Sequence, residues 1–249
     1  MAQHLVSINK KIVPVSKAHI SPMDQGLLYG WGLFETLRIY GGKPFMIREH
    51  MERMISSAKR LGVYVSFEVE ELTLHIDEFI ETAHIFNDVL RITLTKEGML
   101  LLTHRPVVYA KESYRRWFAA KVSSIKRNPT SPLTFMKTLN YMDNILAKQE
   151  AVEAACQEAL LFNDKGYICE GSMSNVFWIK EGCLHTPSVE CGLLPGIARQ
   201  LVIDRLAPLL CIGVREGEYA VEDKAIGGGV PGSITAAIME AYDNQVAGV

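Results

Sequence analysis

The feature that most constrains the fold is the alternation of many short strand-like segments with only a few helical ones. Apolar and β-branched runs of about four to eight residues predict strands, at residues 5–8, 11–15, 33–40, 89–95, 106–110, 119–125, 160–162, 176–179 and 183–185. Apolar residues at helical spacing predict helices at 49–61, 68–83, 141–154 and 196–206. This mixture favours an α+β fold. We expect a small N-terminal lobe over residues 1–112 and a larger C-terminal lobe over residues 113–249.

The composition argues against nucleic acid and membranes as partners. With 26 basic and 28 acidic residues, the formal charge of −2 argues against a broad surface for nucleic acid. No apolar run approaches the ~20 residues that a membrane helix needs, and the first residues lack a secretory pattern. The five cysteines have no CxxC spacing, which predicts reduced thiols and no metal site. We therefore expect a cytoplasmic protein without a nucleic-acid or membrane partner.

Lys137 and Glu170 are the first candidates for chemistry. Lys137 follows a proline-rich loop and has apolar neighbours, and a poorly solvated lysine can form a covalent imine. Glu170 enters a run of small polar residues, which would let a ligand approach the backbone closely. Each residue also has an ordinary interpretation, as a solvated surface lysine and as a turn carboxylate.

Two further features would suit an anion. Gly196 stands at the start of a helical segment, where free backbone N–H groups can bind an anion. Arg53 lies three residues after His50 on one side of a helix and is a candidate phosphate clamp. A plain helix cap and an exposed helix charge are the alternatives. An imine-forming lysine, a carboxylate for the pyridine nitrogen, a helix N-terminus and a basic clamp together match the needs of pyridoxal phosphate.

Ordered motifs run from about residue 5 to residue 221. They are found at 24–30 (DQGLLYG), 32–38 (GLFETLR), 49–53 (EHMER), 137–141 (KTLNY) with the helix that follows to residue 150, 170–177 (EGSMSNVF) and 196–199 (GIAR). In these motifs the chain resembles the class IV aminotransferase family, the fold-type IV pyridoxal-phosphate enzymes. The resemblance implies a two-lobe fold like that of D-amino-acid aminotransferase, pyridoxal 5'-phosphate as cofactor, a small-molecule amino substrate and a homodimer.

The resemblance also implies roles for single residues. Lys137 would hold the cofactor covalently and move the substrate proton, and Glu170 would contact the pyridine nitrogen. The phosphate would be held by Arg53 and by the backbone of Ile197 and Ala198, where many members have Thr in place of Ala198. Ser174 and Asn175 would line the ring. The substrate pocket would take residues from strands, namely Phe34, Thr36, Arg38 and Arg91, with Arg38, Arg91 and Arg105 as candidates for the substrate carboxylate.

Two departures from the family pattern bear on activity. The segment after Thr95 is short, and the Arg-x-His carboxylate trap of D-amino-acid transaminases has no match there. After Asp223 a loop that normally contacts the phosphate is missing, and residues 224–232 resemble the segment that follows that loop. Either the phosphate site is incomplete, or this sequence omits part of the natural chain.

The motifs at 32–38 and 137–148 are most similar to those of 4-amino-4-deoxychorismate lyases of folate biosynthesis, which form 4-aminobenzoate and pyruvate. The alternative is an amino-acid transaminase, acting on branched-chain or D-amino acids. The Gly-Asn-Tyr pattern typical of branched-chain transaminases after the lysine is absent. A third interpretation is a degraded relative that binds the cofactor without turnover.

Overall fold

A computed structural model describes residues 4–107, 119–206, 212–215 and 233–247. The chain divides into two compact units, each described by itself. Unit 1 comprises residues up to 108 together with Lys137–Asn140, and unit 2 comprises most of the remaining chain. The expected lobe boundary, between residues 112 and 113, lies outside the described residues.

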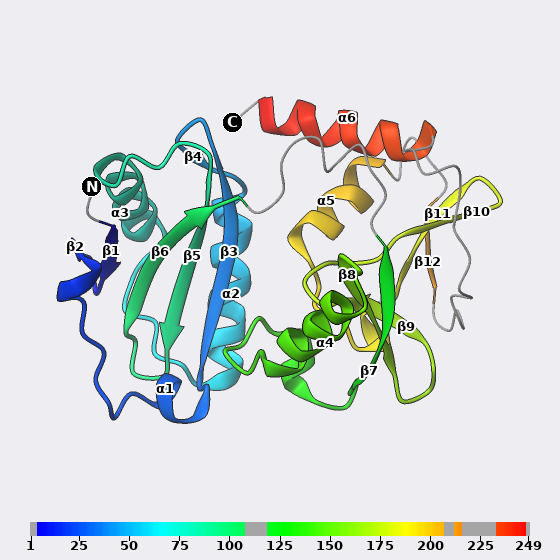
Figure 1. Ribbon diagram of the computed structural model, residues 1–249. Coiled ribbons are helices and arrows are strands. Elements are labelled where there is room, and N and C mark those ends of the chain that lie inside the picture. Colours follow the sequence, from blue (N-terminus) through cyan, green and yellow to red (C-terminus); the bar gives the residue numbers. More distant parts are fainter. Residues whose placement is uncertain (1–3, 108–118, 207–211, 216–232, 248–249) are drawn as a thin grey trace. The chain divides into compact units, whose positions relative to one another are not determined.

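Unit 1 is built on a six-stranded sheet with the strand order β2-β1-β6-β5-β3-β4 (Figure 1). Every neighbouring pair in it is antiparallel. The strands are β1 (Leu5–Ile8), β2 (Lys11–Pro14), β3 (Gly32–Tyr40), β4 (Lys43–Pro44), β5 (Asp88–Thr95) and β6 (Leu100–Pro106). Successive side chains of β3 point to opposite faces of the sheet, so this strand contributes both to the core face and to the second face.

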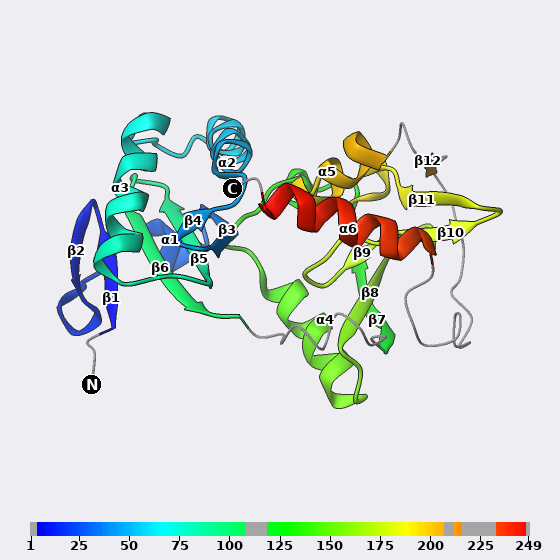
Figure 2. The same cartoon turned by 90° about the horizontal axis from the view of Figure 1, so that it is seen from above.

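Two helices cover the core face of this sheet, as Figure 2 shows from above. Helix α2 (Ile47–Leu61) ends at Gly62, whose φ of 61° is the left-handed conformation that glycine adopts without strain. Helix α3 (Val69–Thr82) follows it. The apolar side of each helix faces the core, which contains fully buried side chains from both helices and the sheet, among them Leu33, Ile39, Met51, Met54, Leu72 and Phe79.

A buried carboxylate joins β3 to α2. Glu35 is 1% exposed and lies on the core face of β3, between Leu33 and Leu37. Its Oε1 accepts a hydrogen bond from Arg53 Nε at 2.8 Å, and Oε2 accepts one from Arg53 Nη2 at 2.6 Å. His50 Nδ1 lies 2.7 Å from Oε2. Burial by itself would raise the pKa of Glu35, but the hydrogen bonds and charges of His50 and Arg53 lower this pKa below its ordinary value.

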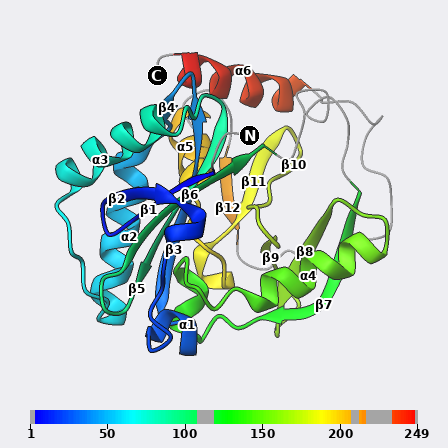
Figure 3. The ribbon, with the colours of Figure 1, turned by 60° about the vertical axis from the view of Figure 1, so that its left-hand side comes forward.

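Unit 2 contains two three-stranded sheets. One has the order β7-β8-β9, with β7 (Ala120–Arg127) parallel to β8 (Glu158–Asn163) and β8 antiparallel to β9 (Ile168–Gly171). The other has the order β10-β11-β12, formed by Trp178–Lys180, Cys183–Pro187 and Ile212–Arg215. Helix α4 (Met142–Glu153) lies alongside β7 and β8 (Figure 3), and the small residues Ala147 and Ala151 allow this close packing. Helices α5 (Ile197–Leu206) and α6 (Ser233–Ala247) complete the unit.

The structure adds elements that the sequence patterns did not predict. The strand expected at 106–110 lies mostly outside the described residues, and its first residue, Pro106, is the last residue of the observed strand β6 (Leu100–Pro106). Residues 96–98 make a tight turn, and Leu100 therefore pairs directly with Leu94. Short or mixed patterns gave no signal for helix α1 (Gln25–Tyr29), for β9 or for α6. No described helix is long and apolar enough to cross a membrane.

Substituting Glu35 by Gln tests the buried junction between β3 and α2. We expect the free energy of unfolding at neutral pH to fall by about 3 kcal/mol, because the Arg53 guanidinium would lose its buried anion. The folded-state pKa of Glu35 lies below the ordinary value of 4.5. The stability difference between wild type and variant is therefore fully present above that value and disappears as the pH falls through the folded-state pKa.

Denaturant unfolding between about pH 3 and pH 8 measures this difference. The matched control is Glu71→Gln, since Glu71 pairs with Lys10 on the surface and should change stability little. An equal effect of the two substitutions would contradict the role assigned to Glu35.

Candidate active site

Lys137 reaches unit 1 through a short extended segment that pairs with the start of β3. Thr138 forms a β-bridge with Leu33, Phe34 N–H donates to Lys137 O at 2.9 Å, and Leu139 N–H donates to the carbonyl of Gly32 at 3.0 Å. The Asn140 amide then donates to Gly30 O at 2.9 Å. Backbone pairing thus fixes the position of Lys137, although it lies about a hundred residues from β3 in the sequence.

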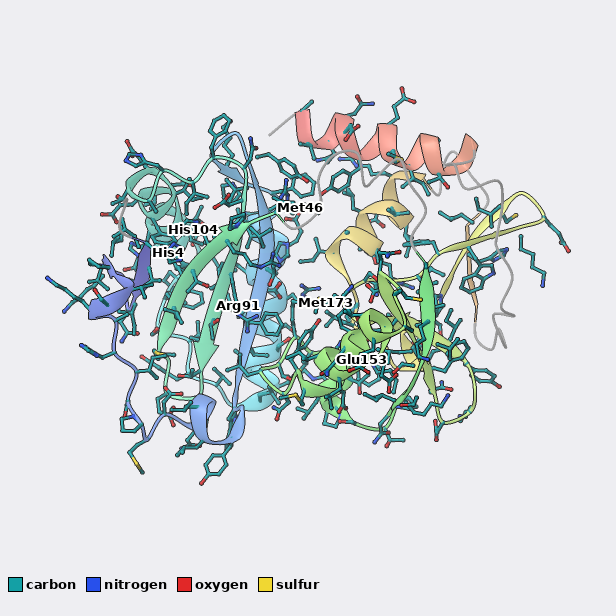
Figure 4. The ribbon with its side chains drawn as sticks, viewed as in Figure 1. His4, Met46, Arg91, His104, Glu153 and Met173 are labelled. Atoms are coloured by element: carbon teal, nitrogen blue, oxygen red, sulfur yellow. The ribbon has the colours of Figure 1, made fainter. Side chains whose placement is uncertain are left out.

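The Lys137 side chain lies against an aromatic ring. Its Nζ is 4.6 Å from the centroid of the Phe34 ring, and the guanidinium carbon of Arg91 is 3.8 Å from the same centroid. Both distances are within the range of cation–π attraction. Arg91 projects from β5 in the middle of the sheet (Figure 4). The Lys137 amine and the Arg91 guanidinium therefore both lie against the buried Phe34 ring.

The substrate-pocket residues predicted on β3 share the face that carries Phe34. By the alternation of the strand, Phe34, Thr36 and Arg38 lie on one side, and Arg91 pairs with Thr36 across the ladder. Arg91 Nε donates to Thr93 Oγ1 at 3.3 Å. Arg38 Nη1 is buried and has no hydrogen-bond partner among the described residues. A buried donor of this kind is costly unless an acceptor satisfies it, which makes Arg38 suited to an anionic group.

Arg53 has a different environment from the one expected. The structure holds its guanidinium on Glu35, which belongs to the opposite face of β3 from Phe34. Arg53 therefore does not join the cluster of Lys137, Phe34 and Arg91. Its predicted contact with a phosphate stays a prediction, and Glu35 and His50 are the partners that orient it in this unit.

In unit 2, Glu170 lies within β9 and is 4% exposed. Arg127, the last residue of β7, places Nη2 2.6 Å from Glu170 Oε1. Leu194 N–H donates to Oε2 at 3.1 Å. The sequence placed Glu170 at the start of a polar run. In the structure it is a buried, ion-paired carboxylate in β9, an environment that suits a charge-assisted hydrogen bond.

A second carboxylate organises the loop after β9. Glu158 Oε1 accepts hydrogen bonds from Ser172 N–H, at 3.1 Å, and from the Ser172 hydroxyl, and Oε2 accepts one from Ser174 Oγ at 2.9 Å. A Cβ on Gly171 would overlap Ser174 Oγ. The side-chain amide of Asn144 in α4 donates to Ser172 O at 2.6 Å. The small residues of this loop are therefore required for close packing.

The start of helix α5 is also closely packed. Gln200 N–H donates to Gly196 O at 2.9 Å, so the helix starts directly after Gly196. A Cβ on Gly196 would overlap Asn175 Oδ1, and the Asn175 amide donates to Leu194 O at 3.0 Å. Ile197 and Ala198 are the first helical residues, and backbone N–H groups at such positions have no partner within the helix.

Arg199, in the first turn of α5, is 6% exposed and ties this end of the helix to β11. It donates to Thr186 Oγ1 at 3.2 Å and to Pro187 O at 2.8 Å. Burial lowers the pKa of Arg199 below its ordinary value. The N-terminus of α5 is thus held firmly and carries a nearby cation, both of which suit a phosphate group.

The arrangement fits pyridoxal phosphate within each unit. Unit 1 supplies an amine against an aromatic face with arginine donors beside it. Unit 2 supplies a buried carboxylate, a glycine at close approach and a helix N-terminus. Residues 224–232, which by their sequence would directly follow an expected phosphate-contacting loop, lie outside the described residues. The part of the chain that the structure describes contains no cluster of three or more His, Cys, Asp or Glu able to hold a metal ion.

Sequence reasoning did not name Glu35, Arg127 or Glu158. Glu35 does have a signal, because an acid among the core-facing residues of a strand needs a basic partner, and His50 and Arg53 lie three apart on the next helix. Arg127 lies two residues after the strand predicted at 119–125, just before the loop that leads to Lys137. No pattern indicates Glu158.

Comparisons with known proteins identify the family and the fold. Residues 32–226 match the model of the family described as Amino-transferase class IV. A Methanocaldococcus jannaschii protein, provisionally named a branched-chain-amino-acid aminotransferase, is 36% identical over 80% of this chain and 73% of its own length. The aminodeoxychorismate lyase of Bacillus subtilis is 30% identical over 88% of this chain and 78% of its own. D-alanine aminotransferases of Staphylococcus also match.

Among solved structures, the branched-chain amino acid aminotransferase of Escherichia coli superimposes with a TM-score of 0.88 at 25% identity, over 98% of this chain and 94% of that one. The expected fold-type IV architecture is confirmed. The family match, the similarity to relatives and the shared fold lead to one conclusion, that this chain belongs to the class IV aminotransferases and is a pyridoxal-phosphate-dependent enzyme.

Proposed function

We propose that the protein is an amino-acid aminotransferase, with branched-chain amino acids as the first substrate class. The observation that carries the proposal is the cluster of Lys137 and Arg91 on the Phe34 ring, with the buried, unsatisfied donor of Arg38 on the same sheet face. An amino acid presents an amine and a carboxylate, and this face offers a lysine and two arginines. Similarity to branched-chain enzymes in sequence and in fold supports the same class.

Each residue would contribute one physical task. Pyridoxal phosphate, when bound, supplies an electron sink for the carbon that loses a proton. Lys137 would hold the cofactor and move that proton as general base and acid. Glu170 would accept a hydrogen bond from the ring nitrogen, while Ser174 and Asn175 shape the wall beside the ring. Ile197 and Ala198 N–H groups, with Arg53, would bind the phosphate, and Arg38 and Arg91 the substrate carboxylate, with Phe34 and Thr36 lining the pocket.

The second candidate function is 4-amino-4-deoxychorismate lyase. The motifs around residues 32–38 and 137–148 favour it, as does the 30% identity to the Bacillus subtilis lyase. In the lyase reaction Lys137 would likewise hold the cofactor and move a proton beside the substrate amine. The lyase substrate also carries carboxylates that arginines could bind. D-amino acids form a third substrate class, which the absence of an Arg-x-His motif after Thr95 disfavours.

Lys137→Ala tests the cofactor role. We expect the wild type to develop a violet-region absorption band with pyridoxal phosphate, and borohydride to abolish this band and leave the cofactor covalently attached. The variant should do neither, and its turnover should fall by about 10³-fold or more. Lys59→Ala, at an exposed position of α2, is the matched control. A reducible band that persists in Lys137→Ala would overturn the assignment.

A direct substrate comparison separates the candidate reactions. The holoenzyme would be given branched-chain L-amino acids with 2-oxoglutarate, D-alanine with 2-oxoglutarate, and 4-amino-4-deoxychorismate. We expect the kcat/KM for the branched-chain L-amino acids, measured by glutamate formation, to be at least about tenfold higher than the kcat/KM for either of the other two substrates. This ratio is equivalent to about 1.4 kcal/mol. Faster release of 4-aminobenzoate and pyruvate from the third substrate would replace this proposal by the lyase.

We also propose a homodimer. Its support within unit 1 is a run of exposed apolar side chains around α1, including Met23, Leu27 and Tyr29, which are 73%, 65% and 69% exposed. Exposed apolar groups in one segment are typical of an interface. Light scattering should give about twice the monomer mass of 27.8 kDa, and Leu27→Glu should shift the protein toward monomer. A wild-type monomer at micromolar concentration would rule the dimer out.

A further inference from the structure

The buried ion pair between Arg127 and Glu170 has no assigned purpose. Arg127 closes β7 and Glu170 lies in β9, on either side of the central strand β8. The two side chains are 13% and 5% exposed, and Nη2 is 2.6 Å from Oε1. The other carboxylate oxygen receives the Leu194 N–H.

The Arg127–Glu170 ion pair is expected to contribute little net stability to the sheet. Arg127 Nε is buried and has no hydrogen-bond partner among the described residues. A buried, unsatisfied donor destabilises the folded state, and buried ion pairs seldom stabilise a fold more than apolar packing does. The position of Arg127 is therefore better explained by an effect on the charge of a neighbouring ionisable group than by a contribution to stability.

The candidates for this neighbouring ionisable group are Cys169, Glu158 and Glu170. Cys169 precedes Glu170, and burial raises the pKa of its thiol to about 12, with further contributions from Cys191 and Glu170. The Cys169 thiol is therefore uncharged at neutral pH and does not compete for Arg127. Glu158, the other nearby carboxylate, is engaged by Ser172 and Ser174. Glu170 is the anion that Arg127 balances.

We propose that Arg127 is a positioning residue, whose guanidinium keeps the Glu170 carboxylate ionised and oriented to accept a hydrogen bond from the protonated ring nitrogen of the cofactor. This inference rests on the cofactor role proposed for Glu170. Without the cation, a carboxylate buried to this degree takes up a proton more readily and becomes a poor acceptor for a pyridinium N–H. Arg127 thereby acts on the cofactor through Glu170 rather than by touching substrate.

The test compares holoenzyme spectra of wild type, Arg127→Met and Arg127→Lys as a function of pH. We expect the acid-side transition of the cofactor band to move upward by about one pH unit or more in Arg127→Met, a tenfold or greater change in proton affinity. Arg127→Lys keeps the charge and should restore most of the wild-type profile. Glu170→Gln should lack the transition, which assigns it to that carboxylate.

Lys126→Met is the matched control, because Lys126 is an exposed cation on the same strand and lies over the Phe162 ring. It should titrate as the wild type does. A wild-type profile in Arg127→Met, with Glu170→Gln altered, would overturn the inference and leave Arg127 a structural clamp. A wild type that forms no band with added pyridoxal phosphate would instead refute the proposed function, so the two failures are distinguishable.

A measurement on the cofactor-free protein covers the case in which Arg127→Met folds poorly. Arg127→Gln removes the charge and keeps polar contacts. The infrared carbonyl band of protonated Glu170, identified by its loss in Glu170→Gln, should appear at higher pH in Arg127→Gln than in wild type. Its appearance at the same pH in both proteins would contradict the inference without reference to turnover.

Discussion

The arrangement of the first unit depends on the backbone pairing between Lys137–Leu139 and the start of β3. Hydrogen bonds to Phe34 and Gly32 place an extended segment from the middle of the chain beside the central sheet. The lysine at its beginning is thereby brought to the Phe34 ring, next to Arg91. A flexible surface loop would give the amine no defined position, and precise placement is what proton transfer requires.

The two faces of β3 then serve different purposes. The core face holds Glu35, whose bonds to His50 and Arg53 join the strand to α2. The other face carries Phe34, Thr36 and Arg38. A strand with alternating side chains can in this way support a site on one side while its other side is clamped to a helix. In the second unit, carboxylates also hold the structure in place. Glu158 accepts hydrogen bonds from the loop after β9, and Glu170 forms an ion pair with Arg127.

Much of the fold could be predicted because it rests on local patterns. The strands over residues 5–8 and 33–40 and the helix ending before Gly62 have clear periodicity and an unambiguous stop signal. Strand β6 was not predicted at its observed position, because that position depends on pairing with β5 across the turn at 96–98, which no local pattern determines. Strand β9 was missed for a similar reason, since a buried glutamate is unusual in a strand unless a distant cation supports it.

The sequence by itself determined the residue types and the order of the motifs, and so the family, the cofactor and the candidates Lys137 and Glu170. Motif spacing carries this information because each motif forms local structure. Only the tertiary structure decided the partners, namely Phe34 and Arg91 for Lys137, Glu35 for Arg53, and Arg127 for Glu170. Such partners lie far apart in the chain, and burial makes a charge depend on the neighbour that the fold supplies.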